Sequence, residues 1–278
     1  MTRPRTSTLG ALPAALVALL TSCAQVGAAR CDEPDNSCNR DLTAQALTLR
    51  TIRARDPAYP VGSPVNVRSV TVTAFDTYDE DGTGRVGTMY LQELSPAGDT
   101  TDPFRPCPLT ADRRHRACAL SLFSPTVAPV GFIPRPGDII DIVGGSYDEF
   151  DCSGVCGNPA QPFPDGRFIP QVARPTARQS GVAPPLAPIA VSLADIEQHN
   201  AALLGVLVTV ENVTALGNPD RRRGEIQVSP GNNGVRITQE FTRITGAASG
   251  TRWSRVTGIV TYFYTPKLVP RGPADLVL

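Results

Sequence analysis

The 278-residue sequence is poor in aromatic residues and histidine and has no excess of charge of either sign. Aromatic side chains make up 6% of the chain, whereas it holds 27 prolines and 24 glycines. So many turn-forming residues require short elements, which argues against a helix bundle or a coiled coil. The formal net charge is zero, from 26 Lys+Arg and 26 Asp+Glu. This balance argues against the strongly basic class of nucleic-acid-binding proteins.

Motifs for catalysis or metal binding are scarce. The chain has no Gly-x-Ser-x-Gly elbow, no phosphate-cradling glycine loop and no paired-histidine metal motif. Its two histidines, His115 and His199, lie far apart in the sequence. The acidic stretch 76–84 does not match the spacing of a calcium loop and is predicted to be an exposed hairpin tip. We therefore expect a protein that is not an enzyme and that needs no metal or other cofactor.

The N-terminus has the pattern of an export signal. Arg3 and Arg5 precede an uncharged apolar run over residues 9–20, which is shorter than the roughly 20 residues that span a bilayer. The run ends in Leu20-Thr21-Ser22-Cys23, which resembles the lipobox of bacterial lipoproteins. The resemblance implies a signal peptide over residues 1–22 and a lipid on the Cys23 thiol.

The same resemblance implies a location. Lipid chains on Cys23 would attach the protein to a membrane without a spanning helix. Ala24 follows the cysteine where a retained inner-membrane lipoprotein often has Asp, which favours the outer membrane. Residues 23–62 would then form a polar tether. The alternative is an ordinary secreted protein cleaved after Ala28 or Ala29.

Seven cysteines are an odd number, and acylation of Cys23 leaves an even set of six. Exported proteins enter an oxidising compartment, so disulfides are the default expectation. A zinc site is the alternative, but structural zinc needs further cysteine or histidine ligands close by. Because the six cysteines fall into three couples that are local in sequence, we predict the bridges Cys31–Cys38, Cys107–Cys118 and Cys152–Cys156.

Two stretches rich in β-branched residues predict two β domains, over residues 63–175 and 205–278. A break in alternation between Val67 and Val70 suggests a bulge, and Gly144-Gly145 suggests a sharply coiled strand. Residues 176–204 are expected to form a proline-rich linker and one short helix that starts at the N-cap Ser192. The predicted strands cover residues 65–75, 86–94, 117–124, 139–147 and 166–172, then 205–213, 225–229, 234–239, 253–264 and 274–278.

The two stretches repeat each other, because the sequence at 70–78 is echoed at 206–214. In each, a long first strand, a polar loop and a late glycine-containing strand predict a mainly β chain of two tandem five-stranded OB-like β-barrel domains. Tandem immunoglobulin-like sandwiches are the alternative, but they need about seven strands each. The second stretch, with its segments 256–260 and 267–271, resembles the OB-like domains of secreted bacterial proteins. That resemblance implies a fold more than a function.

The candidate ligand-binding residues lie in the second stretch. Residues 186–278 hold 9 Lys+Arg and 7 Asp+Glu, whereas residues 23–185 hold 15 and 19. Arg221, Arg222 and Arg223 follow the first strand, in a loop that often lines the ligand face of OB folds. The candidates for base stacking are Tyr262, Phe263, Tyr264 and Trp253. We expect a lipid-anchored envelope module that binds an envelope protein or a glycan, or has a structural role. The alternative is a single-stranded nucleic-acid-binding protein.

Overall fold

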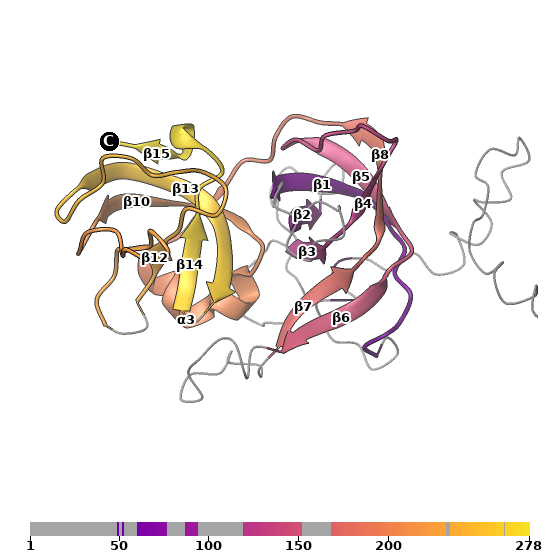
Figure 1. The fold of residues 1–278 in the computed structure, drawn as a ribbon, viewed down its shortest axis with the longest axis horizontal. Helices are drawn as coiled ribbons and strands as arrows, with labels where there is room; N and C mark the ends of the chain where they lie inside the picture. Colours follow the sequence, from indigo (N-terminus) through magenta and orange to yellow (C-terminus); the bar gives the residue numbers. More distant parts are fainter. Residues whose placement is uncertain are drawn as a thin grey trace, which may run out of the picture. The chain divides into compact units, whose positions relative to one another are not determined.

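The computed structural model divides into two compact units, Met1–Gln45 and Ala46–Leu278. All of its described residues lie in the second unit: 49, 52, 60–76, 87–93, 119–151, 168–231, 234–263 and 265–278. This part of the chain is mainly β-strand (Figure 1). The signal peptide, all seven cysteines, His115 and Tyr264 lie outside the described residues, so lipidation and the three disulfides stay predictions.

The first sheet has eight strands and mixes parallel with antiparallel pairs. Its hydrogen-bonded order is β4-β8-β5-β1-β2-β3-β7-β6. One face buries an aliphatic core to which Leu49 and Ile52, from the segment predicted as a tether, also contribute. The strands are β1 (Val67–Phe75), β2 (Met89–Glu93), β3 (Ala119–Phe123), β4 (Thr126–Ala128), β5 (Asp138–Val143), β6 (Ser146–Asp151), β7 (Phe168–Ala173) and β8 (Thr176–Val182).

Two local predictions for this sheet have clear outcomes. The register between β1 and β5 shifts between Val67 and Val70, which confirms the predicted bulge. Ser69 has a φ of 57° there, and its N–H donates to Asp141 Oδ1 at 2.9 Å. The strand predicted over residues 139–147 breaks at Gly144-Gly145, as expected, but it continues beyond the predicted end to Asp151. It is two strands, β5 and β6, because Gly144 and Gly145 both have positive φ and turn the chain.

The proline-rich linker is also partly wrong. Residues 176–182 form β8, which pairs antiparallel with β5. This stretch contains no proline, and Pro175, Pro184 and Pro185 stand outside it. Because proline interrupts a ladder but is tolerated at a strand's ends, these prolines bound the strand instead of preventing it.

The second sheet has seven strands, in the order β11-β12-β14-β13-β10-β9 with β15 paired to β13. It buries a core of its own, in which Trp253 is 3% exposed. Gly258 lies in the middle of β13 because a Cβ there would meet the Val269 carbonyl oxygen at 2.6 Å. The strands are β9 (Ile189–Ala190), β10 (Leu207–Thr214), β11 (Ile226–Gln227), β12 (Arg236–Ile237), β13 (Arg252–Phe263), β14 (Thr265–Val269) and β15 (Leu276–Val277).

The predicted helix is confirmed as α3 (Leu193–Leu203). Ser192 is its N-cap and forms a capping box with Asp195, in which each side chain accepts from the other residue's backbone N–H. Ile196 and Leu203 are buried in the core of the second sheet. His199 has non-helical φ and ψ and marks a kink.

The mainly β prediction is therefore confirmed, but the strand count is not five in either sheet. Neither sheet, over the residues described, closes into a barrel. The two sheets contact each other through a buried cluster that includes Ala74, Tyr90, Leu207 and Ile259. The Leu207 N–H also donates to the side chain of the buried Gln92 at 3.2 Å.

Candidate functional site

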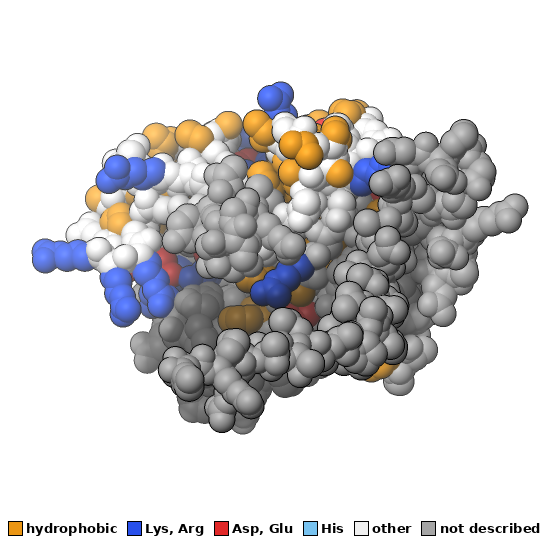
Figure 2. Space-filling view, turned by 45° about the vertical axis from the view of Figure 1, so that its right-hand side comes forward, with side chains coloured by type: hydrophobic (Ala, Val, Ile, Leu, Met, Phe, Trp, Pro, Cys, Tyr) orange, Lys and Arg blue, Asp and Glu red, His pale blue; other side chains and the backbone are white. Residues whose placement is uncertain are grey.

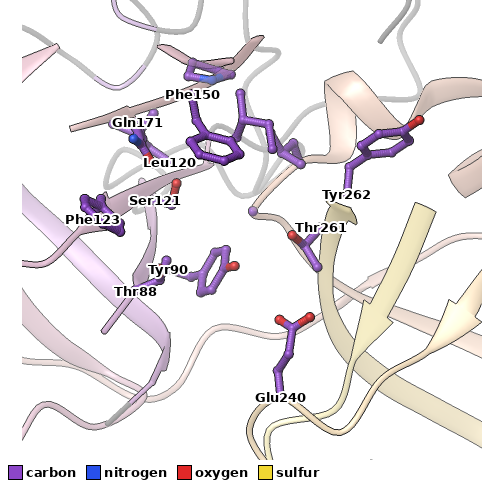
Figure 3. A pocket seen from close by; sticks show the side chains of 14 residues that line it. Thr88, Tyr90, Leu120, Ser121, Phe123, Phe150, Gln171, Glu240, Thr261 and Tyr262 are labelled. Atoms are coloured by element: carbon purple, nitrogen blue, oxygen red, sulfur yellow. The ribbon is translucent and has the colours of Figure 1, made fainter. Parts of the chain in front are cut away.

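A pocket of about 340 Å³ opens between the two sheets (Figure 3). One wall comes from β2, β3, β6 and β7, and the other comes from the end of α3, from β13 and from the loop after β12. Small-molecule sites in proteins have volumes of about 300–1,000 Å³, so this pocket is large enough for a small ligand.

Strand alternation places Tyr90 in this pocket. Met89 and Leu91 are fully buried in the core of the first sheet, so Tyr90 between them faces the opposite way. Its ring packs edge-on against Phe241, with ring centroids 5.8 Å apart and an interplanar angle of 77°. This contact fixes the plane of the tyrosine ring at the pocket wall.

Further aromatic side chains extend the same wall. Phe123 lies on β3 and Phe150 on β6, and both line the pocket. Phe150 is 38% exposed, which is high for a residue of its size. The wall therefore offers apolar ring surface that a ligand could cover.

Hydrogen-bonding side chains lie among these rings. Ser121, Gln171 and Thr261 line the pocket. The Gln171 amide donates to Asp148 Oδ2 at 3.1 Å, which fixes its orientation. Small-molecule sites combine a mostly apolar lining with a few fixed polar groups in this way.

Glu240 is the acidic group of the pocket. Figure 3 shows its carboxylate directed into the space near Tyr90 and Thr261. Solvent reaches the side chain, yet the surrounding protein raises its pKa through desolvation. Nearby Asp76 and Glu225 raise the pKa further, whereas Lys267 and a hydrogen bond from Thr238 lower it. Glu240 thus holds its proton to higher pH than an ordinary glutamate.

Tyr262 on β13 is a predicted stacking candidate that lies at this pocket. It is 5% exposed and lines the pocket, and burial raises the pKa of its hydroxyl. Figure 3 shows that hydroxyl pointing away from Glu240. Tyr262 therefore contributes ring surface to the wall.

The predicted arginines lie at a different pocket, of about 390 Å³, in the second sheet. Arg222 and Arg223 line it together with Arg236 and Thr265, whereas Arg221 does not. Arg221, Arg222 and Arg223 are all exposed. On the face that Figure 2 displays, the largest group of Lys and Arg side chains lies at the left edge, beside acidic side chains.

Asp220 shapes this arginine loop. Its carboxylate accepts backbone N–H bonds from Arg222 and Arg223, at 2.9 and 2.7 Å, and from Glu225 at 2.9 Å. Burial works to raise the pKa of Asp220, but these bonds and the nearby Arg236 charge outweigh it and lower the pKa. The loop is thus held by an ionised aspartate.

A buried ion pair lies beneath the loop. Lys267 Nζ contacts Glu225 Oε1 at 2.6 Å, and the two side chains are 3% and 5% exposed. Arg236 Nη1 donates to the other oxygen of Glu225 at 3.2 Å. Lys267 is the only lysine in the whole sequence.

The structure thus separates the residues that the sequence grouped as ligand contacts. Arg222 and Arg223 line one pocket and Tyr262 lines the other. Trp253, also considered as a stacking platform, is buried in a core. Tyr90, Phe150 and Glu240 were missed, because no local motif marks them and they come together only through the packing of distant strands.

The comparisons give no relative. No protein-family model matches this chain, and no curated protein matches it. Within the described residues, no group of three or more His, Cys, Asp or Glu side chains is placed to hold a metal ion. No helix in that part of the chain has the length and apolar character to cross a membrane.

Proposed function

We propose that this chain is a ligand-binding module of the bacterial cell envelope, without catalytic activity, and that the pocket between its sheets binds a glycan. The observation that carries the proposal is the juxtaposition of ring surface from Tyr90 and Phe150 with the polar groups of Glu240 and Thr261. A sugar ring has an apolar C–H face and a rim of hydroxyl groups, which such a wall complements.

The proposed location rests on the N-terminal sequence. Cys23 would receive the lipid after removal of residues 1–22, and the outer membrane is the proposed address. The remaining cysteines would form the bridges Cys31–Cys38, Cys107–Cys118 and Cys152–Cys156. An envelope protein is the other class of partner that this location allows.

We further propose that the first sheet is an elaborated OB-like unit, formed by residues 63–175 together with β8. Support comes from its two corners: β5 and β6 are separated only by Gly144-Gly145, and β7 and β8 only by Arg174-Pro175. When each couple is taken as one bent strand, β1, β2 and β3 complete a set of five. In this set the first strand pairs with the second and the fourth, and the third pairs in parallel with the fifth. Five strands in a partly open Greek key define the OB fold.

The second sheet, within residues 205–278, has the same pairing pattern. β10 pairs antiparallel with β13, β11 with β12, and β13 with β14, while β12 runs parallel to β14. The Leu216 N–H donates to the Gln227 carbonyl at 2.8 Å, which links the end of β10 to β11. Shared pairing in both sheets supports the internal repeat inferred from the sequence.

Single-stranded nucleic acid is the second candidate ligand. The exposed arginines Arg221 to Arg223 favour it, because cationic side chains track a phosphate backbone. We rank it below a glycan because base stacking needs aromatic rings beside those arginines, and Tyr262 lines a different pocket.

The glycan proposal is tested by substitution in the pocket. Phe150→Ala removes exposed ring surface and is expected to weaken binding of a soluble peptidoglycan fragment about tenfold, which corresponds to about 1.4 kcal/mol. Isothermal titration calorimetry on the purified mature protein gives the affinity. Val130→Ala is the matched control, because Val130 is fully exposed and lies outside this pocket.

The outcome of a wider screen decides the ligand class. If a glycan array that includes the peptidoglycan fragment shows no signal, the glycan proposal is wrong. If an oligonucleotide binds at low salt and loses affinity on replacement of the three arginines, the second candidate replaces it.

A further inference from the structure

The pocket at the arginine loop is lined by more positively than negatively charged side chains. It is separate from the pocket between the sheets, because no residue lines both pockets. Arg222, Arg223 and Arg236 line the arginine-loop pocket together with Asp220 and Glu225. Three cations thus face two carboxylates in the lining, which leaves a surplus of one positive charge.

Both carboxylates are already engaged. Asp220 accepts three backbone N–H groups of its own loop. Glu225 is 5% exposed and accepts from Lys267 at 2.6 Å and from Arg236 at 3.2 Å. The oxygens of both carboxylates are therefore occupied by other donors of the protein. Neither carboxylate forms an ion pair with the guanidinium of Arg222, which is exposed to solvent.

Arg236 places a second guanidinium at the pocket. Its Nη1 donates to Glu225 Oε2 at 3.2 Å, and its Nε is shielded from solvent. The side chain as a whole is 32% exposed, so part of the guanidinium remains open to a bound anion.

We propose that this pocket binds a tetrahedral oxyanion, namely phosphate or a phosphoryl group. The surplus of positive charge in the lining favours an anion such as this group, which is negatively charged near neutral pH. Planar guanidinium groups donate paired hydrogen bonds to phosphate oxygens. Arg222 and Arg236 supply these donors, and Asp220 holds the loop that carries Arg222 in place.

The test compares neighbouring arginines. Calorimetric titration of the purified mature protein with inorganic phosphate at low ionic strength is expected to give measurable binding, which Arg222→Gln weakens about tenfold. Arg221→Gln is the matched control, since it removes the same charge from the adjacent position but from outside the pocket lining. It should change the affinity about twofold or less, through screened long-range charge alone.

A second arm distinguishes a free ion from a lipid headgroup. The same three proteins, each also carrying Cys23→Ser so that no lipid anchors them, are sedimented with phosphatidylglycerol vesicles, with phosphatidylcholine vesicles as the reference. Binding to phosphate identifies a free ion or a soluble phosphoryl ligand. Binding to the anionic vesicles alone, with the same order of variants, identifies a headgroup. Equal losses in the two variants, or no binding to either probe, overturn the proposal.

Discussion

At the scale of the single residue, the Asp220 side chain stabilises its own loop by accepting hydrogen bonds from backbone N–H groups. Three donors converge on one carboxylate. Such local capping is common for aspartate in turns, and the sequence Asn-Pro-Asp-Arg-Arg-Arg was compatible with it. Sequence reasoning nevertheless singled out only the arginines. Three consecutive charges can be recognised in the sequence, whereas the hydrogen-bond geometry of Asp220 depends on how the loop folds.

Asp220→Ala is expected to lower the free energy of unfolding by about 1–2 kcal/mol at neutral pH, as loss of a capping side chain does. The pKa of Asp220 is lowered from its ordinary value of 3.8 by folding. Its contribution is therefore complete above that value and is lost as pH falls through the folded-state pKa. Urea unfolding followed by circular dichroism at pH 7 and pH 3 measures the difference.

The matched control is Asp275→Ala at the end of the short 3-10 helix Pro273–Asp275. Within the described part of the chain, the Asp275 carboxylate accepts hydrogen bonds from Arg271 alone. Asp275→Ala should leave phosphate binding unchanged, whereas Asp220→Ala should weaken it, because Asp220 holds the loop that carries Arg222. If the difference in the free energy of unfolding between wild type and Asp220→Ala is as large at pH 3 as at pH 7, the capping explanation is wrong.

At the scale of the element, the first sheet bends at two points, Gly144-Gly145 and Arg174-Pro175. Gly145 has a φ of 82°, and a Cβ there would meet Pro175 Cα at 2.8 Å and the Ala173 carbonyl oxygen at 2.9 Å. Arg174, with a φ of 51°, turns the facing strand at the same level. Because both strands turn where they touch, the sheet changes direction without losing its ladder.

Gly145→Ala is expected to destabilise the protein by about 2–4 kcal/mol, because it combines a left-handed backbone conformation with a backbone clash. Gly144→Ala is the comparison. Gly144 also has a positive φ, of 66°, but nothing lies within 4 Å of an added Cβ, so about 1–2 kcal/mol is expected. Chemical denaturation of both variants gives the two values, and equal losses would show that the corner tolerates the extra carbon.

The sequence predicted most of these elements because β-branched alternation and a capping box are local signals. The helix at Ser192 and the bulge near Val70 were found in this way. β8 was missed because its flanking prolines suggested a linker, and β4 because three residues are too few for a period. Which strands pair is decided by contacts between distant residues, and so the eight- and seven-stranded sheets could not be derived.

At the scale of the whole molecule, the candidate site depends on contact between the sheets. Tyr90 and Glu240 are far apart in sequence and line one pocket. The Leu207 N–H donates to the buried Gln92 side chain at 3.2 Å, which joins the two sheets. Sequence reasoning treated each half by itself, and for that reason it assigned ligand contacts within one half only.

The proposed anchor is also a property of the whole chain. Cys23→Ser is expected to abolish lipidation, because the thiol is the acceptor of the lipid, and to release the protein from the membrane fraction. Intact-mass measurement of the wild type should show an acylated N-terminal cysteine. Ser22→Ala, which keeps a small residue beside the cysteine, is the control. Membrane association that persists in Cys23→Ser without acylation would contradict the lipoprotein assignment.

Because Lys267 is the only lysine and is buried, its reaction with an amine reagent can report on unfolding. Its ε-amine is the only one in the sequence and is 3% exposed in its contact with Glu225. If the N-terminal cysteine is acylated on its amine as well, the native protein offers amine-reactive reagents no accessible target. Labelling of Lys267 would then measure unfolding of the second sheet without any engineered probe.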